Sequence, residues 1–171
     1  MSAAARRRRA RELALQGLYQ RRVGGADADA VATHWREDPS FAEVDAAFLA
    51  ELWRGVNAEE ASLVDTLAPD LSRTAAELSP IERSILLIGA WELVHRLDTP
   101  YKVVINEAIE LAKAYGGTDG HRFVNAVLDK VAGRVRAAEI AARERERAGD
   151  GRAQPGGAAS RGKRERGPDR G

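Results

Sequence analysis

Residues 79–97 read SPIERSILLIGAWELVHRL, and this stretch decides the fold class. Ser79 followed by Pro80 predicts the start of a helix, because serine caps a helix N-terminus well and proline fits the first helical position. Residues 85–91 are apolar on nearly every side. A helix without a polar face must be covered by other elements, so we expect this one at the centre of the protein. Pro100 closes the segment.

The segments on both sides of this run also space their apolar residues as helices do. In the segment that starts near Phe41, Phe41 and Val44 are expected to begin the buried stripe, and in the segment after Pro100, Tyr115 is expected to point inward. Alternation typical of strands is absent. The sequence predicts an all-α protein of about seven helices in packed bundles. Besides the central one, the helices are expected near residues 10–24, 29–36, 41–57, 61–67, 102–115 and 119–135.

The chain has 171 residues and no cysteine. This length suffices for one domain with a buried core. Without thiols the chain forms neither disulfides nor thiolate metal sites, which fits a reducing compartment. From Gly149 onward the sequence is rich in Gly, Pro and Arg and has no periodic apolar residues. We therefore expect one domain over residues 1–148 and a disordered basic tail over residues 149–171.

Charge is distributed unevenly along the chain. The formal net charge is +1, but residues 1–22 carry +6 and residues 23–100 carry −10. A basic start beside an acidic body indicates two partners, a polyanion for the first and a basic surface for the second. The longest apolar stretch, within residues 84–91, is far shorter than the roughly 20 residues of a membrane span. We expect a cytoplasmic protein that does not associate with membranes.

Five arginines fall within six residues near the start, and they are Arg6, Arg7, Arg8, Arg9 and Arg11. A guanidinium presents a planar fork of donors that matches phosphate oxygens, and it stacks on bases. Exposed arginines at a helix N-terminus oppose the helix dipole by roughly 0.3–1 kcal/mol each. We infer that folding does not explain the cluster and predict an RNA-binding site. The alternative is a solvated arm that only aids solubility.

A second candidate site is TDGHRFVN at residues 118–125. Asp119 can cap the helix that follows, and Arg122 adds positive charge. Phe123 offers a face on which an unpaired base can stack, and Asn125 ends the segment. The competing interpretation is structural, with Asp119 as a helix cap and Phe123 as part of the core.

Two further sets of residues suit a partner protein or RNA. Gln16 and Tyr19 lie beside the arginines, where an exposed tyrosine fits base stacking, a protein contact or plain packing at a helix end. Acidic residues that include Glu77 and Glu82 could receive a basic protein, although a solvated surface is the usual role of a single charge.

The sequence contains no motif that indicates catalysis. There is no GxGxxG, P-loop or GxSxG pattern, no cysteine nucleophile, and no HExxH spacing among the three histidines. We expect a protein that is not an enzyme, with no catalytic residues, no metal and no cofactor.

Three separated segments resemble the NusB family. ARRRRARELALQGLYQ at residues 5–20 resembles the arginine-rich start of these proteins, and LSPIERSILLIGAWEL at residues 78–93 is similar to their central helix. PYKVVINEAIELAKAYGG at residues 100–117, followed by HRFVNAVLDKVA at residues 121–132, resembles their most diagnostic region.

The resemblance implies two three-helix bundles. It also implies binding of single-stranded boxA-type leader RNA together with NusE, a ribosomal small-subunit protein, in an antitermination complex on RNA polymerase that supports ribosomal RNA transcription. Tyr19 and Glu82, with Glu77, would lie toward NusE. The RNA-binding residues that it implies, with Arg6 added, are Arg6, Arg7, Arg8, Arg9, Arg11, Gln16, Asp119, Arg122, Phe123 and Asn125.

Two other functions stay open at this point. The chain can be an RNA-binding module related to the N-terminal domain of some RNA cytosine methyltransferases, or a helical DNA-binding regulator. A homodimer that masks the arginines is also compatible with the sequence.

Overall fold

The computed structural model describes residues 1–152, which contain eight α-helices and no β-strand. The prediction of an all-α fold is confirmed. The chain divides into a compact unit, Met1–Ala137, and a second unit that begins at Ala138. Within the described residues no helix is long and apolar enough to cross a membrane. The helices are α1 (Ala3–Gly24), α2 (Ala28–Glu37), α3 (Ala46–Ala58), α4 (Glu60–Leu67), α5 (Pro80–His95), α6 (Tyr101–Tyr115), α7 (Gly120–Val135) and α8 (Ala137–Arg152), and the 3-10 turns are η1 (Pro39–Glu43), η2 (Ala68–Asp70) and η3 (Ala75–Glu77).

Helix α5 is the centre of the compact unit, as its sequence predicts. The Ser79 hydroxyl accepts a hydrogen bond from the Glu82 N–H at 3.1 Å, and Pro80 is the first helical residue. Every residue from Ser84 to Leu93 is buried. Helices α1, α3, α4, α6 and α7 all pack against α5. It is thus covered all round, as an apolar helix must be.

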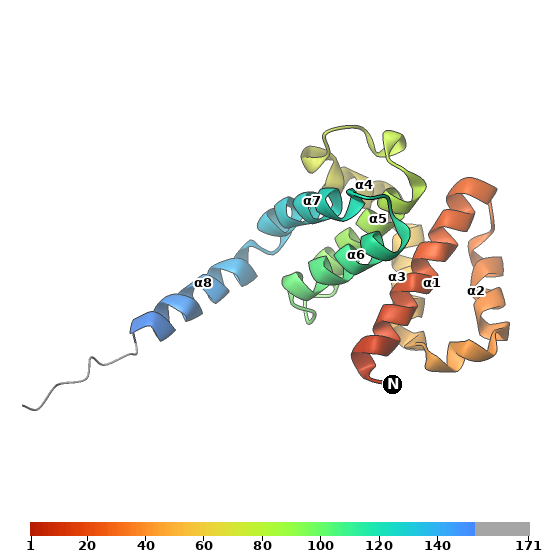
Figure 1. Ribbon diagram of the computed structural model, residues 1–171, viewed down its shortest axis with the longest axis horizontal. Helices are drawn as coiled ribbons and strands as arrows, with labels where there is room; N and C mark the ends of the chain where they lie inside the picture. The colour runs from red at the N-terminus through yellow and green to blue at the C-terminus, as the bar shows by residue number, and fades with distance from the viewer. Residues whose placement is uncertain (153–171) are drawn as a thin grey trace, which may run out of the picture. The chain divides into compact units, whose positions relative to one another are not determined.

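The other helices form two bundles around α5. Helix α1 packs with α2 and α3, whereas α6 and α7 pack on each other and on α5 (Figure 1). In the first bundle the Trp35 and Trp53 rings meet edge to face, with centroids 4.8 Å apart, against Gly17 of α1. Gly25, with a φ of 69°, ends α1 in the left-handed conformation that favours glycine.

The predicted start of the third helix near Phe41 is wrong. Phe41 lies in the turn η1, and Val44 is extended, with φ −99° and ψ 144°. The Asp45 carboxylate then caps α3 by accepting from the Phe48 N–H at 3.1 Å. Tyr115 does not point inward either, because it is exposed at the last residue of α6.

The second unit contains α8, which the apolar pattern did not predict. Up to Ala148 its sequence consists mostly of Ala, Glu and Arg, which are strong helix formers, and a Glu139–Arg143 ion pair of 3.6 Å has the i, i+4 spacing that supports a helix. Because α8 continues to Arg152, the expectation of disorder is wrong for residues 149–152. The rest of the predicted tail, residues 153–171, lies outside the described residues.

Candidate nucleic-acid interface

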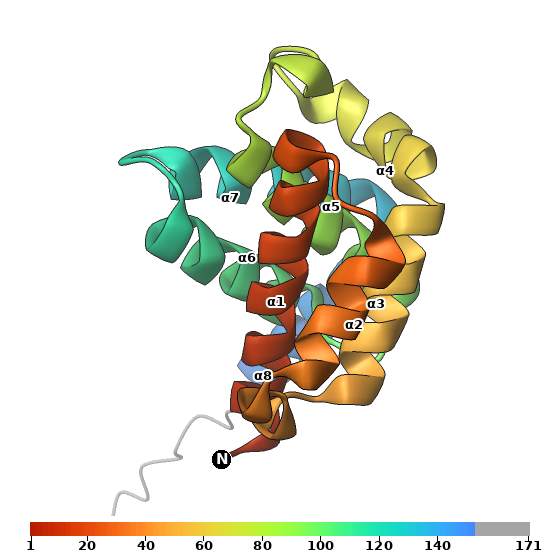
Figure 2. The ribbon, with the colours of Figure 1, turned by 90° about the vertical axis from the view of Figure 1, so that its right-hand side faces the viewer.

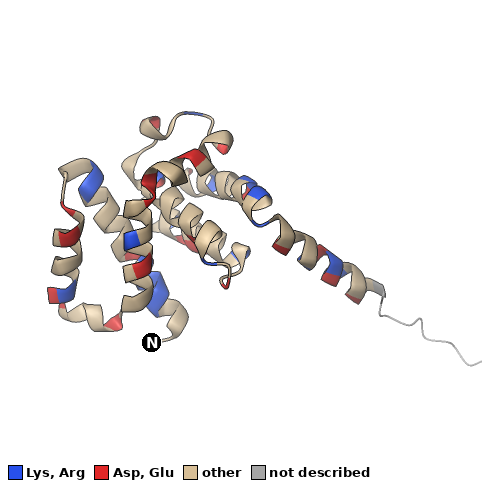
Figure 3. Cartoon of the chain, turned by 180° about the vertical axis from the view of Figure 1, so that it is seen from behind, with Lys and Arg blue, Asp and Glu red and all other residues tan. Residues whose placement is uncertain are grey.

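The arginine-rich start is helical and forms the first turns of α1. The Ser2 hydroxyl accepts a hydrogen bond from the Ala5 N–H at 3.1 Å, and the helix begins at Ala3. Figure 3 shows the resulting basic stretch next to the N-terminus. Because successive residues of a helix are about 100° apart, the five arginines point in different directions and have different neighbours.

Arg8 reaches across to α6. Its Nε and Nη2 donate to the two carboxylate oxygens of Glu107, each at 3.0 Å. The hydrogen bond and the charge of Glu107 raise the pKa of Arg8 above its ordinary value. The Arg8 side chain is still half-exposed. Glu107 thus holds the Arg8 guanidinium through two parallel hydrogen bonds, which is also the geometry in which arginine binds a phosphate.

Three further arginines face the segment that leads into α3. Their contacts join the start of α1 to residues 43–45. Exposed ion pairs of this kind contribute little stability and exchange partners readily. The contacts are Arg6 Nη2 to the Val44 carbonyl at 3.1 Å, Arg7 Nε to Asp45 Oδ2 at 3.6 Å, and Arg9 Nη2 to Glu43 Oε2 at 3.7 Å.

Arg11 lies inside the protein, so its predicted contact with RNA is wrong. The side chain is only 4% exposed, and Nε and Nη2 donate to the Glu92 carboxylate at 2.9 and 2.7 Å. Its guanidinium carbon lies 5.1 Å from the ring centroid of Phe48. Position 11 shares the face of α1 that packs on α5, where a charge needs a buried partner.

The start of α7 carries the second candidate cluster. Arg122 is exposed and has no hydrogen-bond or ion-pair partner among residues 1–152. Phe123 is half-buried, and the Arg73 guanidinium lies 5.4 Å from its ring centroid. In the part of the chain that the structure describes, the Asp119 carboxylate makes no capping hydrogen bond. The expected role of Asp119 as a side-chain cap is therefore not observed.

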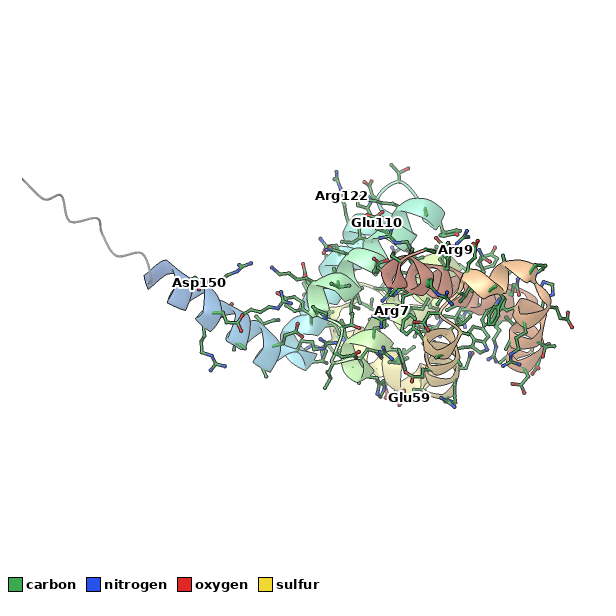
Figure 4. All side chains as sticks on the ribbon, turned by 90° about the horizontal axis from the view of Figure 1, so that it is seen from below. Arg7, Arg9, Glu59, Glu110, Arg122 and Asp150 are labelled. Atoms are coloured by element: carbon green, nitrogen blue, oxygen red, sulfur yellow. The ribbon has the colours of Figure 1, made fainter. Side chains whose placement is uncertain are left out.

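Helix α6 lies between the two clusters. It packs against α5 and α7, and its Glu107 holds Arg8 of α1. Figure 2 shows α6 beside α1, with the start of α7 following its far end. In Figure 4, Arg122, Glu110 of α6 and Arg9 lie along one edge of the compact unit. We call this region, from the start of α1 across α6 to the start of α7, the basic edge.

The remaining predicted site residues lie near these helices. Gln16 and Tyr19 are exposed on α1, and Asn125 is half-buried on α7. The Glu82 carboxylate is 4.0 Å from Arg73, and a Cβ on Gly120 would lie 3.3 Å from Glu82 Oε1. The first turn of α5 is therefore next to the start of α7.

Glu77 has a local structural role. Its carboxylate accepts hydrogen bonds from the Thr74 N–H at 2.7 Å and the Thr74 hydroxyl at 2.8 Å. These bonds favour the ionised carboxylate and lower the pKa of Glu77 below its ordinary value. Glu77 thus closes a capping box around the turn η3 while it stays exposed.

Sequence reasoning missed two residues of this region. Glu107 is not among the predicted site residues, although its side chain is only 15% exposed and holds Arg8. Its spacing of i−3 and i+4 from the buried Val104 and Leu111 is the signal that could have found it. Arg73 comes from an irregular segment, and no periodic pattern could have placed it over Phe123.

Within residues 1–152, no group of three or more His, Cys, Asp or Glu side chains could hold a metal ion. The chemistry that the basic edge offers is the binding of anions and of flat rings, through guanidiniums and one half-buried phenyl ring.

These features define a class, a small helical protein of two bundles with an arginine-rich edge, and the comparisons name its family. The profile of the NusB family matches residues 8–133. "Transcription antitermination protein NusB" of Azoarcus sp. (strain BH72) is 55% identical over 155 residues, covering 90% of this chain and all of that protein. The protein of the same name from Ralstonia nicotianae is 55% identical over 137 residues, covering 80% of this chain and 88% of that one. A solved structure described as T. maritima NusB is 27% identical, with a TM-score of 0.66 over 74% of this chain and 90% of that chain. The chain belongs to the NusB family.

Proposed function

We propose that this protein is a transcription antitermination factor that binds single-stranded boxA-type leader RNA together with NusE. In this proposal the pair joins the antitermination complex on RNA polymerase in the cytoplasm and supports ribosomal RNA transcription. Membership of the NusB family, whose curated relatives carry the name transcription antitermination protein, supports the proposal. The protein acts by binding and not by catalysis.

The observation that carries the RNA-binding part is the basic edge. Arg8 holds a bidentate carboxylate there, and Arg122, which has no partner among residues 1–152, lies along the same edge. Arg11 does not contact RNA but supports the helix that presents the other arginines. The proposed RNA-binding residues are Arg6, Arg7, Arg8, Arg9, Gln16, Asp119, Arg122, Phe123 and Asn125.

Affinity and sequence preference come from different parts of this edge. Phosphate contacts by arginine release counterions, so affinity falls as salt rises, with a slope of about −0.7 per phosphate for a single strand. Phe123 and its neighbours select unpaired bases by stacking and edge contacts. Displacing Arg73 would free the Phe123 ring that Arg73 now covers.

Tyr19, Glu77 and Glu82 are proposed to face NusE. Tyr19 is an exposed aromatic side chain on α1, and Glu77 and Glu82 supply negative charge for a basic partner. If both partners share one surface, each raises the affinity for the other, typically by about 1–3 kcal/mol.

The test is RNA binding by the Arg7→Ala/Arg8→Ala variant, measured by fluorescence anisotropy with boxA RNA, scrambled RNA and duplex DNA, with and without NusE. We expect at least a roughly tenfold loss of boxA affinity and a salt slope about 1.4 units shallower, as expected for two lost phosphate contacts. Arg36→Ala/Arg54→Ala is the matched control, because both arginines are exposed on α2 and α3. Unchanged boxA affinity in the Arg7→Ala/Arg8→Ala variant would exclude the basic edge as the RNA-binding site. Wild-type binding that prefers duplex DNA, or ignores the boxA sequence even with NusE, would exclude the antitermination role.

A further inference from the structure

A small polar cavity of about 190 Å³ lies where the C-terminal half of α1 meets α5 and the junction of α3 with α4. Glu60 of α4 is one of its walls, and the neighbouring Glu59 lies in Figure 4 on the opposite edge from Arg9 and Arg122. The cavity is thus separate from the basic edge. Its lining residues are Leu18, Arg21, Arg22, Asn57, Glu60, Arg83, Ser84 and Leu87.

Three guanidiniums and one carboxylate line this cavity. Arg83 is mostly buried, with 12% of its side chain exposed, and its Nη2 donates to Glu60 at 2.8 Å. Arg21 donates to the Asn57 side-chain oxygen. Arg22 has no hydrogen-bond or ion-pair partner within the described part of the chain. The walls therefore carry an excess of two positive charges.

Helix stability accounts for only part of this charge. Arg21 and Arg22 are in the last turn of α1, where the helix dipole favours cations. Arg83 is in the first turns of α5, where the dipole opposes a cation. Only one of its five N–H donors has a protein partner among residues 1–152. The nitrogens that lack a partner are all accessible to solvent. The other donors remain available to a small ligand.

We propose that this cavity is an anion site that binds a phosphate group. Two of its guanidiniums are held in place by Asn57 and Glu60, and Arg22 is free to close on the ligand. The Ser84 hydroxyl already donates to the Pro80 carbonyl at 2.7 Å, so the guanidiniums supply the contacts. A doubly charged oxyanion neutralises the excess charge, and several adjacent oxygens match the arginine forks. Free phosphate, pyrophosphate and the terminal phosphate of a nucleotide share this chemistry.

The test is an NMR titration of the full-length, ¹⁵N-labelled protein with inorganic phosphate, pyrophosphate and GTP, each at constant ionic strength set with chloride. We expect saturable shifts of the Nε–H signals of Arg21, Arg22 and Arg83, with pyrophosphate binding at least fivefold more tightly than phosphate. GTP binding as tightly as pyrophosphate identifies a nucleotide as the source, and weaker GTP binding identifies the free anion.

Arg22→Ala should weaken pyrophosphate binding about tenfold, the usual effect of losing one charge-assisted hydrogen bond. Arg22→Lys should restore part of the affinity, because it keeps the charge but not the fork. Arg36→Ala is the control, since it removes another exposed arginine that lies outside the cavity. Shifts that do not saturate, shifts confined to Arg6–Arg9, or an Arg22→Ala variant that binds like wild type would overturn the proposal.

Discussion

At the scale of single residues, neighbouring arginines of one helix have opposite roles. Arg8 and Arg11 are both in contact with Glu107, at 3.0 and 3.8 Å, yet Arg8 is half-exposed and Arg11 is enclosed with Glu92. Three positions leave the two side chains only about 60° apart around the helix axis, so both reach Glu107, but Arg11 is one turn further along α1 and points at Glu92 of α5. Arg8 can exchange its carboxylate for a phosphate, whereas Arg11 cannot leave Glu92 without leaving a buried charge unpaired.

The buried pair makes a prediction about stability. Arg11→Met should lower the free energy of unfolding by about 3–5 kcal/mol, because it leaves the Glu92 carboxylate buried without its partner. The Arg11→Met/Glu92→Leu variant should recover most of that loss, since no charge then remains in the core. Urea denaturation followed by tryptophan fluorescence measures both. If the single variant were as stable as wild type, the Arg11–Glu92 pair would not be buried as described.

Glu107 makes a prediction about affinity that depends on the proposed function. Its carboxylate occupies the Arg8 fork and repels an approaching phosphate. Glu107→Gln should raise boxA affinity roughly fivefold, because it removes about 1 kcal/mol of repulsion between the carboxylate and the RNA phosphate. Glu51→Gln is the control, because Glu51 pairs with Arg96 at 2.8 Å, outside the basic edge. Equal or weaker binding by Glu107→Gln would show that Glu107 orients Arg8 and does not compete with RNA.

At the scale of helices, close approach depends on small residues. Helix α1 meets the indoles of α2 and α3 at Gly17, where an added Cβ would lie 2.7 Å from both Trp35 and Trp53. At Gly133 of α7, an added Cβ would meet no other part of residues 1–152 within 4 Å, apart from the adjoining backbone of its own helix. Alanine substitutions at the two glycines therefore distinguish the cost of close packing from the gain in helix propensity.

Gly17→Ala should destabilise the protein by about 1 kcal/mol or more, since overpacking costs roughly 1–3 kcal/mol and exceeds the gain in helix propensity. Gly133→Ala should stabilise it by about 0.5–1 kcal/mol, because nothing opposes that gain. Thermal or urea unfolding measures both changes. Stabilisation by both substitutions would contradict the close packing of α1 on the two tryptophans.

At the scale of the whole molecule, the residue just after α7 closes the compact unit. The Arg136 guanidinium donates to backbone carbonyls at the end of α5 and in the turn after it. These contacts tie the ends of α5 and α7 together and satisfy carbonyls that a helix end leaves free. The acceptors are Leu93 at 2.6 Å, Arg96 at 2.8 Å, Thr99 at 3.0 Å and Glu92 at 3.1 Å.

A protein that ends at Ala137 should therefore unfold at the same urea concentration as the full chain, since it keeps Arg136 and every core residue. Arg136→Met in the full chain should cost about 3 kcal/mol, because it leaves buried carbonyls without donors. Equilibrium urea unfolding tests both variants. A marked loss of stability on truncation would mean that residues beyond Ala137 contribute to the core.

The sequence by itself determined the fold class, the position of α5 and most helix boundaries. These depend on local chemistry, such as Ser79 and Pro80 at a helix start, a glycine at a helix end and apolar spacing along one face. It also indicated which residues carry the charge of the basic edge. The apolar pattern did not predict helix α8, because this helix is stabilised by helix propensity and charge pairs and has no apolar stripe.

Only the tertiary structure decided what each arginine does. Whether a guanidinium is free, held by a carboxylate or buried depends on residues far away in the chain, such as Glu92 and Glu107 for the arginines of α1. Electrostatic partners are set by distance in space, and a local pattern contains no information about distances between helices. For the same reason the three arginines of the polar cavity, two from α1 and one from α5, meet only in the folded protein.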